Sequence, residues 1–68
     1  MCGIIGIASD KSVSSNIINS LKRLEYRGYD SAGLATLNNN LIIEKKCSGR
    51  VEQLEKIIFE SPVKGNIG

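Results

Sequence analysis

The 68-residue sequence predicts a small α/β (α+β) fold with the element order strand, helix, strand, strand, helix. Two observations support this. Short apolar runs, some rich in β-branched residues, alternate with longer stretches in which apolar residues recur every three or four positions. Clusters of Asn and Gly separate the segments and are typical of turns. Hydrophobic residues make up 41% of a chain this short, so we expect at most one domain with a thin core.

The first strand is expected at Gly3–Ala8, because this short run contains three isoleucines. A helix is expected from Ser12 to about Tyr26, where apolar residues follow helical spacing. Ser12 is a candidate N-cap, and Gly28 is a candidate stop signal. The apolar stripe of this helix consists of Val13, Ile17, Ile18, Leu21 and Leu24.

Two further strands are expected at Ala32–Leu37 and Leu41–Lys46. Asn38–Asn40 joins them, and asparagine tolerates left-handed backbone angles, so the pair is predicted to form a hairpin. Val51–Phe59 returns to helical spacing, and Pro62 follows its end.

The last residues, Lys64–Gly68, are expected to form a turn followed by the start of another strand at Ile67. The predicted elements can cover one face of a sheet at best. We therefore expect residues 1–68 to be part of a larger domain that is truncated at its C-terminal end.

Composition excludes several functions. Nine basic and seven acidic residues are interspersed, which gives a net charge of +2 and no basic patch for nucleic acid. Two cysteines and no histidine cannot supply a usual zinc site, and we expect no metal or other cofactor. No apolar run could span a membrane. No secretory segment is recognisable, so we expect free thiols, a reducing compartment and a cytoplasmic location.

Cys2 is the first candidate catalytic residue. If Met1 is removed, Cys2 carries both a thiol and a free α-amine, whose pKa of about 7.7 to 8.0 lets it act as a general base. The amine could then activate the thiol of its own residue without a histidine. Gly3 would leave room for a substrate carbonyl. The alternative is that Cys2 is a small buried hydrophobic residue of the first strand.

A second motif, LEYRGYDSAG at residues 24–33, follows the first predicted helix. Together with Met-Cys-Gly-Ile at the start, the run Arg27-Gly28-Tyr29-Asp30-Ser31-Ala32-Gly33 resembles the N-terminal nucleophile (class II) glutamine amidotransferases. The resemblance implies the α/β/β/α sandwich of the N-terminal nucleophile hydrolases, of which this chain would be the N-terminal part.

The resemblance also implies roles for individual residues. Cys2 would attack the side-chain amide of L-glutamine, Arg27 would shape the site, and Gly28 would allow close backbone approach. The spelling of the motif is closest to family members that pass the ammonia to fructose 6-phosphate. The family's carboxylate-binding and oxyanion-stabilising groups lie in segments that these 68 residues do not contain, so we expect this chain alone to be inactive.

Alternatives remain open at this point. The family member could use a different acceptor, or the chain could be a non-catalytic remnant. Arg27 could simply form a surface ion pair with Glu25 or Asp30. Cys47 is expected to be an ordinary strand residue, although Lys45 and Lys46 lie beside it. A complete protein of this family could form a homo-oligomer.

Overall fold

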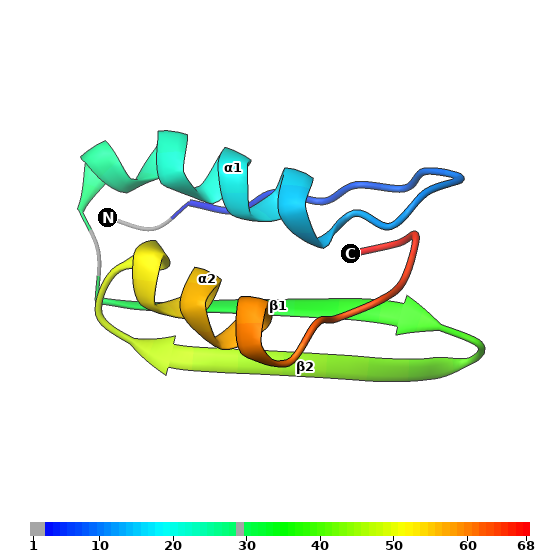
Figure 1. The fold of residues 1–68 in the computed structure, drawn as a ribbon. Helices are drawn as coiled ribbons and strands as arrows, with labels where there is room; N and C mark the ends of the chain where they lie inside the picture. Colours follow the sequence, from blue (N-terminus) through cyan, green and yellow to red (C-terminus); the bar gives the residue numbers. More distant parts are fainter. Residues whose placement is uncertain (1–2, 29) are drawn as a thin grey trace.

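The computed structural model describes residues 3–28 and 30–68. In these residues a two-stranded antiparallel sheet carries two helices on one of its faces (Figure 1). The predicted α+β fold class is confirmed. The elements are α1 (Ser14–Leu24), the 3-10 helix η1 (Glu25–Arg27), β1 (Ser31–Asn38), β2 (Leu41–Ser48) and α2 (Val51–Glu60).

The predicted hairpin is confirmed, and its strands are slightly longer than expected. β1 and β2 pair in register from Ser31 opposite Ser48 to Asn38 opposite Leu41. Asn39 and Asn40 form the two-residue turn, with φ angles of 53° and 66°. Two consecutive positive φ angles define the type of turn that matches the right-handed twist of a hairpin, and asparagine adopts them more readily than most residues.

The first predicted helix is confirmed in extent, but its predicted cap is wrong. The helix begins at Ser14 with Val13 as its N-cap residue, and no side chain caps it. The amide N–H of Val13 donates to the carbonyl oxygen of Gly65 at 3.0 Å, so the C-terminal segment, and not Ser12, holds this end of the helix. At the other end η1 stops at Gly28, as expected, with φ 112°.

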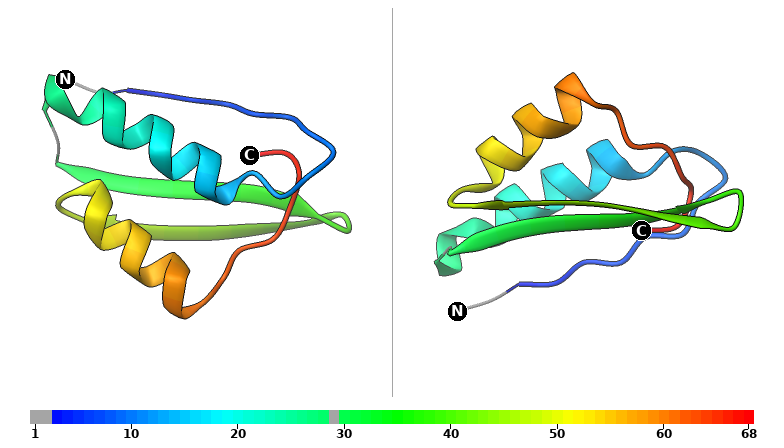
Figure 2. Two further views of the ribbon diagram at one scale, coloured as in Figure 1. Left: turned by 45° about the horizontal axis from the view of Figure 1, so that its top comes forward. Right: turned by 90° about the horizontal axis from the view of Figure 1, so that it is seen from below.

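Gly3–Ala8 was expected to be a strand, but the structure contains only one isolated bridge there, between Ala8 and Ile67. Ile7 and Gly68 exchange two backbone hydrogen bonds of 2.8 and 2.9 Å. A strand needs a partner along its whole length, and in the described part of the chain only this short C-terminal stretch pairs with it. Figure 2 shows the extended N-terminal segment running beside the hairpin.

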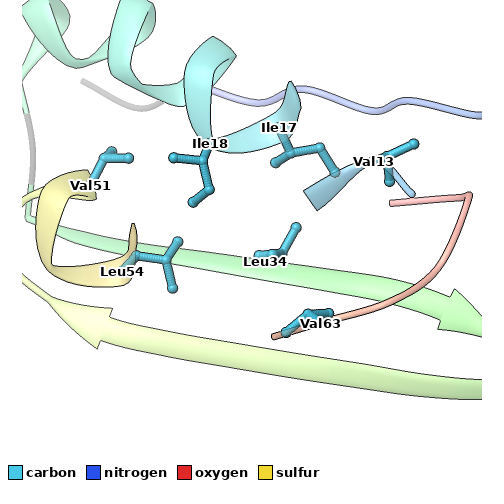
Figure 3. Close-up of a cluster of buried hydrophobic side chains, with 7 residues drawn as sticks. All are labelled: Val13, Ile17, Ile18, Leu34, Val51, Leu54 and Val63. Atoms are coloured by element: carbon cyan, nitrogen blue, oxygen red, sulfur yellow. The ribbon is translucent and has the colours of Figure 1, made fainter. Parts of the chain in front are cut away.

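The core lies between the helices and the hairpin (Figure 3). Leu54 of α2 and Val13 are fully buried, which confirms the helical spacing that predicted them. Thr36 is also buried, and its hydroxyl donates to the carbonyl oxygen of Lys64 at 2.7 Å. The buried hydrophobic cluster consists of Val13, Ile17, Ile18, Leu34, Val51, Leu54 and Val63.

The opposite face of the hairpin is open. Leu37 of β1 and Ile42 of β2 are opposite one another on this face, and Ile42 is 75% exposed. The prediction that these elements cover only one sheet face therefore agrees with the structure. Among the described residues, neither α1 nor α2 is long and apolar enough to cross a membrane.

Candidate functional site

A cavity of about 460 Å³ lies where the first described residues approach the loop between η1 and β1. Gly3 and Gly28 both line it, although 25 positions separate them in the sequence. Gly3 directly follows Cys2, and Gly28 directly follows Arg27. The complete lining is Gly3, Leu21, Leu24, Glu25, Gly28, Asp30, Ser31, Ala32, Gly33 and Val51.

Gly3 is packed closely against the end of α1. A Cβ atom added at this position would lie 3.0 Å from both the Cβ and the Cδ1 atoms of Leu24, which is tighter than most real contacts. A side chain at position 3 would therefore require either Leu24 or the backbone of Gly3 to move by a few tenths of an ångström. The absence of a side chain at Gly3 allows its backbone to lie this close to α1.

Gly28 forms the turn after η1. Its amide N–H donates to the carbonyl oxygen of Glu25 at 2.9 Å, and its φ of 112° is one that residues with a side chain rarely adopt. Two residues further on, the carbonyl oxygen of Asp30 accepts a hydrogen bond of 2.9 Å from the amide N–H of Gly49. The loop is thus held at its far end by the residues that precede α2.

Glu25 holds the near end of the same loop. One oxygen of its carboxylate, Oε2, accepts a hydrogen bond of 2.8 Å from the amide N–H of Val51, the first residue of α2. The other oxygen, Oε1, lies 3.6 Å from Nη2 of Arg50, and the Glu25 side chain is only 13% exposed. A carboxylate in this position satisfies a free N–H at the start of a helix and interacts favourably with the helix dipole.

Sequence reasoning missed this role of Glu25. The structure pairs its carboxylate with the start of α2, whereas the sequence suggested only a surface ion pair with Arg27. One sequence signal could have indicated it: the residue before α2 is Arg50, which cannot cap a helix as Ser, Thr, Asp or Asn can. The free N–H groups at the start of a helix without its own cap need a hydrogen-bond acceptor from another part of the chain.

The predicted site residues are described to different extents. Cys2 lies outside the described residues, and so does Tyr29. Arg27 is the last residue of η1, and only its backbone is described. Gly28 is described in full and lines the cavity. The structure therefore places Gly3, the residue after Cys2, and Gly28, the residue after Arg27, around one cavity.

Cys47 is a free thiol on β2, as expected. Its Sγ lies 4.0 Å from the carbonyl oxygen of Arg50, and its partly buried side chain packs against the core. It does not line the cavity described above. Within residues 3–28 and 30–68, no group of three His, Cys, Asp or Glu side chains could hold a metal ion.

No family model matches the sequence. All 68 residues do align with curated proteins that are named glutamine–fructose-6-phosphate aminotransferase (isomerizing). Identity is 52% with the protein from Clostridium acetobutylicum, 48% with that from Bartonella henselae and 46% with that from Agrobacterium fabrum. The chain spans 11% of the length of each of these relatives.

Proposed function

Because its 68 residues are homologous throughout to a segment of the glutamine–fructose-6-phosphate aminotransferases, we propose that this chain supplies the nucleophile of a glutaminase site. In the complete protein that site would release ammonia from L-glutamine. The ammonia would then be transferred to fructose 6-phosphate to give glucosamine 6-phosphate. Residues 1–68 would be the N-terminal part of the glutaminase domain.

The observation that carries the proposal is the shared cavity of Gly3 and Gly28. The residue after the proposed nucleophile and the residue after the proposed site-shaping arginine meet there, next to a loop that is anchored at both ends. Such anchoring suits a catalytic site, because reacting groups must be held in a fixed relation to each other.

In the proposed mechanism, the α-amine of a processed Cys2 takes the proton of the thiol. The sulfur then forms a bond to the side-chain carbonyl carbon of glutamine. The carbon–nitrogen bond breaks as the amine returns the proton to the leaving nitrogen, which departs as ammonia. Water hydrolyses the remaining glutamyl thioester to glutamate and restores the thiol.

Two neighbouring residues would shape the site without taking part in these steps. Arg27 would hold the loop in the geometry that the nucleophile requires. Gly28 would let the backbone of the loop approach the first residues of the chain. The contacts of Glu25 with Val51 and of Asp30 with Gly49 support this assignment, because they fix the loop on both sides of these two residues.

The 68-residue chain on its own is expected to show no glutaminase turnover. Removal of one oxyanion-stabilising donor typically costs an enzyme about a hundredfold to a thousandfold in turnover. By resemblance, these donors and the group that binds the substrate carboxylate belong to other segments of the family domain. We further propose a cytoplasmic location, in keeping with the free thiol of Cys47, and a homo-oligomer for the complete protein.

The test is a labelling experiment with a diazoketone analogue of glutamine, followed by intact-mass measurement and peptide mapping. The chain without Met1 should gain one label at Cys2, and Cys2→Ala should abolish it. Two controls isolate the proposed chemistry: Cys47→Ala should label normally, and a chain that retains Met1 should label more slowly because its Cys2 has no free amine.

Two results would contradict the proposal. Equal labelling of Cys2 and Cys47 would mean that Cys2 has no special reactivity, as expected of a non-catalytic remnant. Steady release of glutamate by the isolated chain would show that the 68 residues form a complete site, which we do not expect.

A further inference from the structure

Glu25 carries a shielded carboxylate that the proposed mechanism does not use. Its side chain is 13% exposed, and the residue lines the cavity of about 460 Å³ together with Gly28 and Val51. A charged group withdrawn from water to this extent needs hydrogen-bond partners that compensate for the lost hydration. The partners of Glu25 therefore indicate what this residue does.

Two hydrogen bonds of Glu25 connect the loop after η1 to α2. Its carboxylate accepts the amide N–H of Val51 at 2.8 Å, and its main-chain carbonyl oxygen accepts the amide N–H of Gly28 at 2.9 Å. Because Val51, Glu25 and Gly28 all line the cavity, this part of its wall is one hydrogen-bonded unit. The position of Gly28 relative to α2 therefore depends on the side chain of Glu25.

A second connection of the loop involves main-chain atoms alone. The carbonyl oxygen of Asp30 accepts the amide N–H of Gly49 at 2.9 Å, and a change of side chain at Asp30 would leave both bonding atoms in place. The connection through Glu25 is different, because a single substitution removes its acceptor. Glu25 is thus a residue at which the placement of the loop can be altered while its main-chain bond to Gly49 remains.

The bond to Val51 has strict requirements on length. It needs an oxygen at the end of a side chain as long as that of glutamate. Glutamine has the same length and also ends in an oxygen acceptor, whereas aspartate keeps the charge but is one methylene shorter. The contact with Arg50 matters less, because its distance is 3.6 Å and the Arg50 side chain is 61% exposed.

We propose that Glu25 is a positioning residue for the glutaminase reaction. It acts through the loop: its bond to Val51 keeps Gly28 in place on the wall of the cavity that Gly3 also lines. The inference rests on the proposed function, since the reacting group is Cys2. A misplacement of about 1 Å can cost about a hundredfold in rate, so loss of Glu25 slows the chemistry although no reacting group is removed.

The test measures how fast the diazoketone analogue of glutamine labels Cys2 in the chain without Met1. Glu25→Ala should label at least about tenfold more slowly, because the loop loses its bond to α2. Glu25→Gln should label within about threefold of the unsubstituted chain, because it keeps an oxygen acceptor at the same length. Glu25→Asp should be as slow as Glu25→Ala, because its carboxylate does not reach the amide N–H of Val51.

Two controls separate positioning from a general loss of stability. Val63→Ala removes volume from the core at a residue that does not line the cavity, and it should label as fast as the unsubstituted chain. Iodoacetamide, which needs no binding site, should alkylate Cys2 equally fast in all variants. It should alkylate the partly buried Cys47 slowly in all of them, since unfolding would expose that thiol.

Three results would overturn the role of Glu25 alone. The first is equal labelling of Glu25→Ala and the unsubstituted chain. The second is fast labelling of Glu25→Asp with slow labelling of Glu25→Gln, which would show that charge matters and the hydrogen bond does not. The third is equally slow labelling of Val63→Ala, which would indicate lost stability. Absence of label at Cys2 in the unsubstituted chain would instead contradict the proposed function, and the role of Glu25 with it.

Discussion

Replacement of Glu25 by alanine is expected to lower the free energy of unfolding by about 2 kcal/mol. The main loss is the 2.8 Å hydrogen bond between its carboxylate and the amide N–H of Val51. Hydrogen bonds to charged groups contribute about 1.5–3 kcal/mol, and loss of a helix N-cap costs about 0.5–2 kcal/mol. These two ranges describe the same interaction and are not added. The contact with Arg50, whose side chain is 61% exposed, contributes less than about 1 kcal/mol.

Urea unfolding followed by circular dichroism measures this effect. With a urea dependence near 1 kcal/mol per M for a small domain, the midpoint should fall by about 2 M. Glu52→Ala is the matched control: Glu52 lies in the first turn of the same helix, its side chain is exposed, and it should cost less than about 0.5 kcal/mol. Glu25→Gln keeps an oxygen acceptor and should lose about half as much as Glu25→Ala.

Equal losses of stability in Glu25→Ala and Glu52→Ala would contradict this expectation, since the burial of Glu25 and its hydrogen bond would then make no difference. The expected loss is large for this chain. At about 0.05–0.15 kcal/mol per residue, 68 residues give a total stability of only about 3–10 kcal/mol.

The same unfolding assay checks three further expectations. Gly65→Ala should cost about 1–3 kcal/mol, because φ is 141° there and the new Cβ would lie 2.8 Å from the carbonyl oxygen of Leu37 in β1. Gly6→Ala is the control and should cost less than about 1 kcal/mol, because its new Cβ would have its nearest neighbour at 3.8 Å. Thr36→Val should cost about 1–2 kcal/mol, because it removes the 2.7 Å hydrogen bond from the hydroxyl of the buried Thr36 to the carbonyl oxygen of Lys64, and Thr36→Ser should retain that bond. Leu54→Ala should cost about 2–5 kcal/mol, since Leu54 is fully buried, and a loss below about 1 kcal/mol would contradict the position of the core.

The parts of the fold that the sequence predicted correctly depend on local signals. The hairpin follows from the Asn-rich turn between two strand-forming runs, and α2 follows from the spacing of apolar residues such as Val51 and Leu54. Burial on a helix face is a local periodic property, so it can be recognised without knowledge of the partner. The end of η1 at Gly28 is predictable for the same reason, because it depends on the conformational freedom of one residue.

The parts that were missed depend on contacts between distant residues. The first strand could not be judged from its own isoleucines, because its pairing depends on Ile67 and Gly68. The start of α1 is held by Gly65, and this made Ser12 an incorrect choice of cap. Hydrophobic patterning indicates which side chains are buried, but it does not specify which backbone groups will meet across the fold.

The same distinction applies to the candidate site. The motif that contains Arg27 and Gly28 predicted a functional loop, but the contact of this loop with α2 was missed, because its one sequence signal is that Arg50 cannot cap that helix. In the structure Val51, the first residue of α2, anchors one end of the loop through Glu25, and Gly49, in the link that precedes α2, anchors the other end through Asp30. A change at the beginning of α2 should therefore alter the shape of the cavity that Gly28 lines, even though it would leave the loop sequence intact. If the proposed function holds, a substitution at Val51 that disturbs its bond to Glu25 should slow the labelling of Cys2 that tests that function.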